Sequence, residues 1–236
     1  MEMFFIIAAA LLPAILLVLY ICKEDPKPEP KSWLIKAVLL GIVIIFPVIF
    51  VESSIDSMLF GAGGVPTNLV GTTIQAFLGA ALPEELFKLF ALWLILRKNP
   101  YFDEHFDGIV YAVCIGLGFA AIENVSYVLG GEDWISVAIS RALFAVPGHY
   151  AFAVLMGYYY SIYHFVDHSP KVAACVLFVP VLAHGIYDSI AFSGMVNPYL
   201  GVVATLVLIY FCVQMHKVAR NKIMVQVNRD KESNIV

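Results

Sequence analysis

The sequence predicts an all-α membrane protein, a polytopic helical bundle of about seven transmembrane helices. Of its 236 residues, 61% are apolar and only 14% are charged, whereas soluble domains average roughly 45–50% apolar and about 25% charged residues. Several apolar runs approach the roughly 20 residues that a helix needs to cross a bilayer. The alternating polarity of membrane β-strands is not seen in these runs.

The apolar runs and the breakers between them place the predicted helices in order. The first run, residues 4–22, is long and lacks a basic leader, so we expect a retained helix rather than a signal peptide. The connections are rich in proline, glycine or charge and cover residues 23–31, 61–67 within a longer loop, 97–106, 130–133, 164–170 and 194–198. The predicted spans are therefore 3–22, 33–51, 68–96, 107–129, 134–164, 170–193 and 198–217.

The basic residues fix the orientation of the bundle, because Lys and Arg near the ends of spans are retained in the cytoplasm. With seven helices, the eleven basic residues in the connections, in the tail or at the ends of the spans all fall on one side, and the other side carries acids such as Glu2, Glu52 and Glu132. The amino terminus is therefore predicted outside and the carboxyl terminus in the cytoplasm. The basic residues are Lys23, Lys27, Lys31, Arg97, Lys98, Lys171, Lys217, Arg220, Lys222, Arg229 and Lys231.

The whole chain, residues 1–236, is predicted to form a single integral membrane domain in the plasma membrane. Within it we expect a catalytic helical core at 68–193 and a polar cytoplasmic tail at 218–236, ordered only near the membrane. The lipid bilayer is one expected partner. A formal net charge of −4 provides no basic surface for nucleic acid.

An unusual set of nine polar or ionisable residues stands out inside the predicted spans. A charged group at the centre of a membrane helix costs on the order of 2.5–3.5 kcal/mol, so such residues face the bundle interior and mark sites. Counted at about 1.5 Å per residue, Glu84, Glu123, His149 and His184 each lie about 20–24 Å along their own helix. Four helices thus place one such residue in the same central layer, which indicates a shared site. The full set is Glu84, Glu85, Lys88, Glu123, Asn124, Arg141, His149, His184 and Asp188.

The spacing within two helices predicts how these residues divide their roles. His184 and Asp188 are four residues apart and share a helix face, so the carboxylate can orient the imidazole. Glu84 has the same spacing from Lys88, but Glu85 points about 100° away from Glu84. One glutamate is therefore expected to face the reactive centre while the other pairs with a cation such as Lys88.

Carboxylates and imidazoles around a small wet cavity suit the activation of water. A glutamate can take a proton from water, while histidines hold that water, stabilise an oxyanion or ligate Zn²⁺. The candidate catalytic residues are Glu84, Glu85, Glu123, His149, His184 and Asp188. If Zn²⁺ is bound, the expected ligands are Glu123, His149 and His184. Bare glutamate chemistry and zinc chemistry both stay open at this point.

Four segments resemble the PrsW family of intramembrane proteases, which is related to the CAAX prenyl endopeptidases and bacteriocin-processing enzymes. The segments are Glu84-Glu85-Leu-Phe-Lys88, Phe119-Ala-Ala-Ile-Glu123-Asn124-Val-Ser-Tyr127, Arg141 through Pro147-Gly148-His149, and His184-Gly185-Ile-Tyr-Asp188. The wider group has histidine where this chain has Glu123 and arginine one position after Lys88, which favours PrsW. The resemblance implies an intramembrane endopeptidase that cuts a single-pass membrane protein, such as an anti-sigma factor, at or near the outer face.

Two other classes of function compete with a protease. Chains of Glu, Asp and His also form proton relays, so a proton-coupled transporter is the main alternative. Transporters commonly show two related halves, and this sequence shows no such repeat. The third hypothesis is a non-catalytic protein that binds transmembrane segments.

Overall fold

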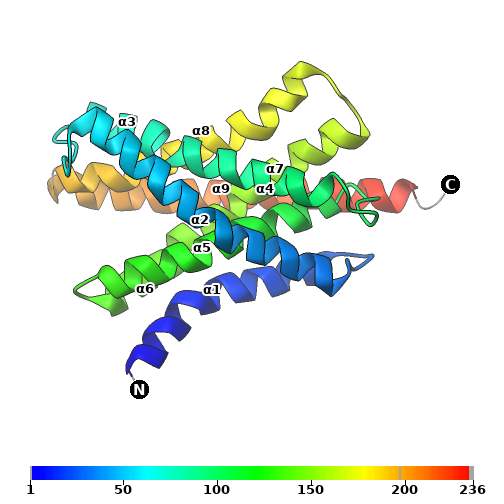
Figure 1. Ribbon diagram of the computed structural model, residues 1–236, viewed down its shortest axis with the longest axis horizontal. Helices are drawn as coiled ribbons and strands as arrows, with labels where there is room; N and C mark the ends of the chain where they lie inside the picture. Colours follow the sequence, from blue (N-terminus) through cyan, green and yellow to red (C-terminus); the bar gives the residue numbers. More distant parts are fainter. Residues whose placement is uncertain (1, 197, 234–236) are drawn as a thin grey trace.

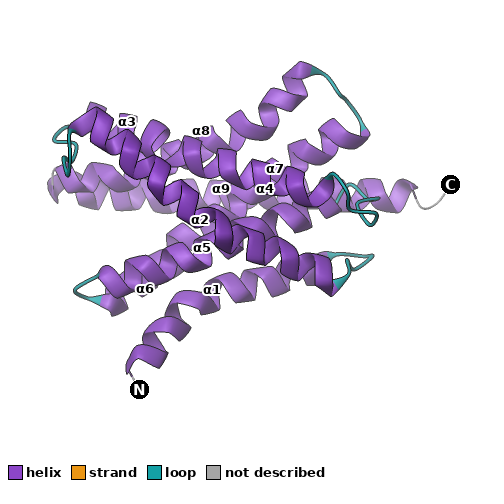
Figure 2. Cartoon of the chain, in the orientation of Figure 1, coloured by secondary structure: helices purple, strands orange, loops and turns teal. Residues whose placement is uncertain are grey.

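The computed structural model describes residues 2–196 and 198–233, and within these ranges it contains helices and loops but no strand (Figure 2). The elements are α1 (Glu2–Glu24), α2 (Lys31–Phe60), α3 (Leu69–Ile74), η1 (Gln75–Ala81), α4 (Leu82–Leu96), α5 (Asp107–Gly130), α6 (Trp134–Ser140), η2 (Arg141–Ala145), α7 (Val146–Phe165), α8 (Pro170–Val196) and α9 (Pro198–Ser233).

Seven long helical segments make up the described part of the chain, because α3, η1 and α4 follow one another without a break, as do α6, η2 and α7. Six of the segments are long and apolar enough to cross a membrane; the remaining one, residues 69–96, carries the paired glutamates. The helices run along one common direction, with the connecting loops at the two ends (Figures 1 and 2). The predicted all-α membrane bundle is confirmed.

The helix α5 lies at the centre of the bundle, between α1, α2 and α7 (Figure 1). Its side chains are buried almost without interruption from Asp107 to Ala120. Glycines allow the neighbours to approach closely: a Cβ on Gly118 would lie 2.3 Å from the carbonyl oxygen of Val38 in α2, and one on Gly157 in α7 would lie 2.3 Å from that of Gly108. Small residues at such crossings let backbones pack together in membrane bundles.

Two helices extend beyond their predicted ends. The helix α2 continues to Phe60 instead of ending near residue 51, because its polar outer turn finds a partner: Gln75 donates a hydrogen bond to Asp56 Oδ2 at 3.0 Å. The helix α9 continues to Ser233, so the tail is ordered well beyond the membrane boundary. Ala219 and Ile223 of α9 are buried, and Asp230 accepts hydrogen bonds from the backbone N–H of His105 and Phe106.

Two short π-helical segments lie just before the site residues Glu84 and His149. In η1 the N–H of Leu82 bonds to the carbonyl of Phe77, five residues back, and in η2 the N–H of Val146 bonds to that of Arg141. Each segment ends two residues before a proline, Pro83 or Pro147. A proline inside a helix has no N–H and its ring clashes with the carbonyl four residues earlier. The wider π-turn makes room for that ring, and such turns are frequent at functional sites.

The close crossing of α2 and α5 gives a first prediction. Replacing Gly118 with Leu forces a side chain against the Val38 carbonyl, so we expect a loss of about 1–3 kcal/mol or more of stability. The matched control is Gly130→Leu, because a Cβ at the exposed end of the same helix meets no atom within 4 Å. Thermal unfolding in detergent micelles measures both. Equal midpoints for the two variants would contradict the close crossing.

Candidate active site

The Lys88 ammonium lies at the centre of a buried cluster of charged side chains. It donates hydrogen bonds to Glu84 Oε2 and Glu85 Oε1, each at 2.8 Å, and its Nζ lies 3.2 Å from His149 Nδ1. The ring of Phe119 covers the ammonium at 4.4 Å. All four polar side chains are buried. The predicted pairing with Lys88 therefore involves both glutamates, not one.

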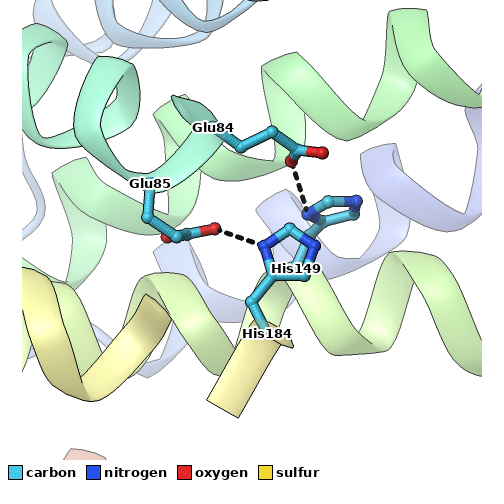
Figure 3. Close-up of side chains that lie close together, drawn as sticks. All are labelled: Glu84, Glu85, His149 and His184. Carbon is cyan, nitrogen blue, oxygen red and sulfur yellow. Dashed lines mark hydrogen bonds and ion pairs between the residues drawn. The ribbon is translucent and has the colours of Figure 1, made fainter. Parts of the chain in front are cut away.

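Both histidines present the same pattern of contacts. Their Nδ1 atoms face the glutamate pair: His184 Nδ1 lies 3.0 Å from Glu85 Oε1, and His149 Nδ1 lies 3.9 Å from Glu84 Oε2 (Figure 3). Their Nε2 atoms face other carboxylates, at 2.9 Å from Glu123 Oε2 for His149 and 3.2 Å from Asp188 Oδ2 for His184. Because Lys88 donates to Nδ1 of His149, the ring proton lies on Nε2 and is donated to Glu123.

The glutamate pair and the two histidines form a candidate set of metal ligands, and an ion bound there would have to displace the Lys88 ammonium, which contacts Glu84, Glu85 and His149. Glu84, Glu85, His149 and His184 each offer one donor atom, and these atoms lie within 4.8 Å of one another (Figure 3). Glu85 Oε2 is buried and has no hydrogen-bond partner among the described residues. Imidazole nitrogens with carboxylate oxygens are a donor set that zinc accepts. Glu123, expected from the sequence to be a ligand, contacts His149 but lies outside this group of four.

A second charged group connects Glu123 to the outer half of the site. Arg141 donates to Glu123 Oε2 and to Asn124 Oδ1, each at 2.6 Å, and its guanidinium lies 4.0 Å from the ring of Tyr127. Asn124 in turn donates to the carbonyl of Ala10 at 2.7 Å, which ties α1 to α5. Arg141 therefore neutralises Glu123, and its position is fixed from several sides.

Packing holds the histidine of α8 in place. The ring of Phe152 stacks on His184 at 4.7 Å between centroids. Next to it, a Cβ on Gly185 would lie 2.4 Å from the ring of Phe77 in η1, so α8 and η1 meet at a glycine. This explains why a glycine stands inside the His184-Gly185-Ile-Tyr-Asp188 segment: any larger residue would push His184 away from Glu85.

A cavity of about 550 Å³ leads from the cluster toward the outer ends of the helices. Glu84, Glu123, His149, His184 and Asp188 line its inner part, whereas Glu85 is absent from its lining. Of the two glutamates, Glu84 therefore faces the cavity. Its outer wall includes Glu52, Asp56, Gln75, Ser126, Tyr127, Ser140 and Met195.

The polar residues on the outer cavity wall were not among the sequence-predicted site residues. Glu52 and Asp56 were assigned to a loop because they follow the apolar run of α2. Their spacing of four residues is the signal for a shared helix face. Their position on the cavity wall shows that α2, which carries none of the motifs, also contributes to the site.

A bundle of membrane helices that encloses acids and imidazoles at the inner end of a cavity has the architecture of a membrane-embedded hydrolase. A comparison with family models identifies which class of hydrolase this is. The model described as PrsW family intramembrane metalloprotease matches residues 29–215. The chain belongs to this family, and it is a multi-pass membrane protease.

Curated relatives agree with this assignment. Three proteins named Protease PrsW are similar to this chain: one from Bacillus subtilis is 33% identical over 95% of this chain and 100% of its own length. One from Oceanobacillus iheyensis is 33% identical over 83% and 89%, and one from Geobacillus kaustophilus is 34% identical over 79% of each chain. No solved structure matches the chain.

The central ammonium yields the second prediction. Replacing Lys88 with Met leaves Glu84 and Glu85 buried without their counter-charge, and breaking a buried ion pair in this way costs about 3–5 kcal/mol. Lys98→Met is the control, because Lys98 is exposed at the cytoplasmic end. Thermal unfolding in micelles should show a large drop for the first variant alone.

A double variant tests the contact between Lys88 and Glu85 by changing both side chains. Adding Glu85→Gln to Lys88→Met removes one of the two unpaired charges, so part of the lost stability should return. A double variant that is less stable than Lys88→Met by the full effect of Glu85→Gln would show that the two side chains do not interact.

Proposed function

We propose that the chain is an endopeptidase that hydrolyses a peptide bond in a single-pass membrane protein, by water activated between Glu84 and the two histidines. The observation that carries this proposal is the position of Glu84, His149 and His184 at the inner end of the 550 Å³ cavity. A cavity of this size falls within the range of about 300–1,000 Å³ that accommodates small ligands or a short stretch of extended chain.

The substrate is reached from the outer side in this proposal. The cavity wall beyond the cluster is built from outer helix ends, such as Asp56 of α2, Gln75 of η1 and Met195 of α8. The scissile bond would then lie near the outer face of the membrane. The family resemblance adds an anti-sigma factor as the type of single-pass substrate.

Glu84 is the proposed general base. It lines the cavity and can take a proton from water as the water oxygen attacks the peptide carbonyl, then pass that proton to the amine that leaves when the C–N bond breaks. Glu85, which does not line the cavity, holds Lys88 and His184. This division of roles follows from which carboxylate meets the cavity.

Glu123 and Asp188 are the proposed positioning residues. Each lies within hydrogen-bond distance of Nε2 of one histidine, which orients the ring so that Nδ1 faces the glutamate pair and Lys88. Such carboxylate–histidine pairs orient metal-ligating imidazoles. If Zn²⁺ is held by His149, His184 and Glu85, it would polarise the peptide carbonyl and lower the pKa of bound water, with Glu84 left as the base.

The function is tested by cleavage of a tagged single-pass substrate in proteoliposomes. Glu84→Gln should lower the rate by about 10²–10⁴-fold, the usual contribution of a general base, and Glu85→Gln and His184→Ala should also lose cleavage. Glu132→Gln, an exposed glutamate of the outer loop, is the matched control and should cut as the wild type does. Full activity of all the site variants would refute the assignment. Proton transport without cleavage would favour the transporter hypothesis.

The metal is tested separately, by zinc content instead of activity. Purified protein equilibrated with saturating zinc and passed through a desalting column should retain one zinc per chain, and His149→Ala and His184→Ala should retain none. Glu123→Gln should still hold zinc, because it orients His149 rather than binding the metal. Loss of zinc from Glu123→Gln would instead make Glu123 a ligand, as the sequence predicts. A wild type without zinc, and insensitive to chelator, would favour bare glutamate chemistry.

A further inference from the structure

A second group of buried acids lies at the cytoplasmic end of the bundle, away from the outward-leading cavity. Asp25 comes from the α1–α2 loop, Glu104 from the α4–α5 loop, and Asp107 is the first residue of α5. One carboxylate oxygen of each lies within 4.8 Å of the other two. Their exposed fractions are 6%, 8% and 0%. In Figure 1 both loops lie at the same end of the molecule.

In two of these carboxylates only one of the two oxygens has a hydrogen-bond partner among the described residues. Asp25 Oδ1 accepts from the backbone N–H of Lys27 at 3.0 Å, and Asp107 Oδ2 accepts from the N–H groups of Asp103 and Glu104 at 3.1 and 2.8 Å. In contrast, Asp25 Oδ2 and Asp107 Oδ1 are buried and have no hydrogen-bond partner within the described ranges. A buried carboxylate oxygen without a donor is costly, and in native proteins it calls for an explanation such as a bound ion.

The donors around the cluster already serve other acids. The Lys27 ammonium bonds both oxygens of Asp103, at 2.9 and 2.8 Å, and His105 Nδ1 lies 2.8 Å from Asp230 Oδ1. Tyr111 donates its hydroxyl to Glu29, a further buried acid. Lys27, His105 and Tyr111 are thus engaged by acids outside the cluster.

Two acids of the α1–α2 loop have raised pKa values. Burial raises the pKa of Asp25 to about 6, and the nearby Glu104 adds to the effect. Burial likewise raises the pKa of Glu29 to about 7. A positive charge among these groups would favour their ionised forms.

We propose that Asp25, Glu104 and Asp107 bind a hard divalent cation, Mg²⁺ or Ca²⁺, at the cytoplasmic face. All three donors are oxygens, which such ions prefer, whereas zinc and copper favour nitrogen or sulfur. The ion joins the α1–α2 loop to the α4–α5 loop and to the start of the central helix. It is thus a structural site, distinct from the histidine-containing cluster in the membrane.

The experiment uses the full chain in detergent micelles after treatment with a chelator. Adding saturating Mg²⁺ or Ca²⁺ should raise the midpoint of thermal unfolding by about 3 °C or more, because a ligand that binds only the folded state stabilises it. The variant Asp25→Asn/Asp107→Asn keeps a side-chain oxygen at each position that can accept from the backbone N–H groups, but it loses two charges. Its midpoint of thermal unfolding should not respond to the ion. The ion that shifts the wild type at the lower concentration is the preferred one.

Two controls separate the site from its surroundings. Glu24→Gln/Glu232→Gln removes the same charge from exposed positions at this end and should respond as the wild type does. His184→Ala disables the membrane cluster and should also respond. If the asparagine variant does not fold, elemental analysis of desalted His184→Ala should still find one Mg²⁺ or Ca²⁺ per chain. An unchanged wild-type midpoint, equal shifts in the cluster variant and its control, or no bound ion overturns the proposal.

Discussion

The arrangement of the membrane site depends on keeping buried charge paired where water is scarce. Lys88 contributes the positive charge to which Glu84 and Glu85 are both bound at 2.8 Å, and the face of Phe119 covers the same ammonium. An unpaired charge there would be expensive, so each further acid has its own partner. Glu123 has Arg141 and His149, and Asp188 has His184. The four helical segments that carry these groups are thereby held in one mutual geometry.

Glycine contacts allow that geometry to be reached. The central helix α5 carries Phe119 and Glu123, and it approaches α2 and α7 so closely that a Cβ at Gly118 or Gly157 would collide with backbone. Between α8 and η1, a Cβ on Gly185 would collide with the ring of Phe77. Without these approaches the side chains of neighbouring helices would be separated by at least another layer of methyl groups. Hydrogen bonds of 2.6–3.2 Å between helices would not form across such a gap.

The sequence predicts the helices and the membership of the cluster well, because both rest on strong local signals. Hydropathy marks the spans, and the cost of charge in lipid makes Glu84, Glu123, His149 and His184 conspicuous at one depth. The contacts among these residues cannot be predicted from the sequence in the same way. Nothing in the chain distinguishes Glu84, which meets the cavity, from Glu85, which does not, and the extra turns of α2 and α9 depend on partners as distant as Gln75 and His105. Such pairings are set by tertiary packing, which periodicity does not encode.

Each of the two π-turns shifts the rotational phase of its helix, so the half after the turn faces a different direction from the half before it. A π-turn adds one residue without lengthening the helix by a full step, so everything after it is rotated by about 100° relative to a continuous α-helix. In residues 69–96 and 134–165 the motif-bearing half follows such a turn. The direction in which Glu84 and His149 point is therefore set by the turn, the proline and the packing that follow it, and not by the orientation of α3 and α6. A change in the outer half of either helix need not rotate the residues of the site.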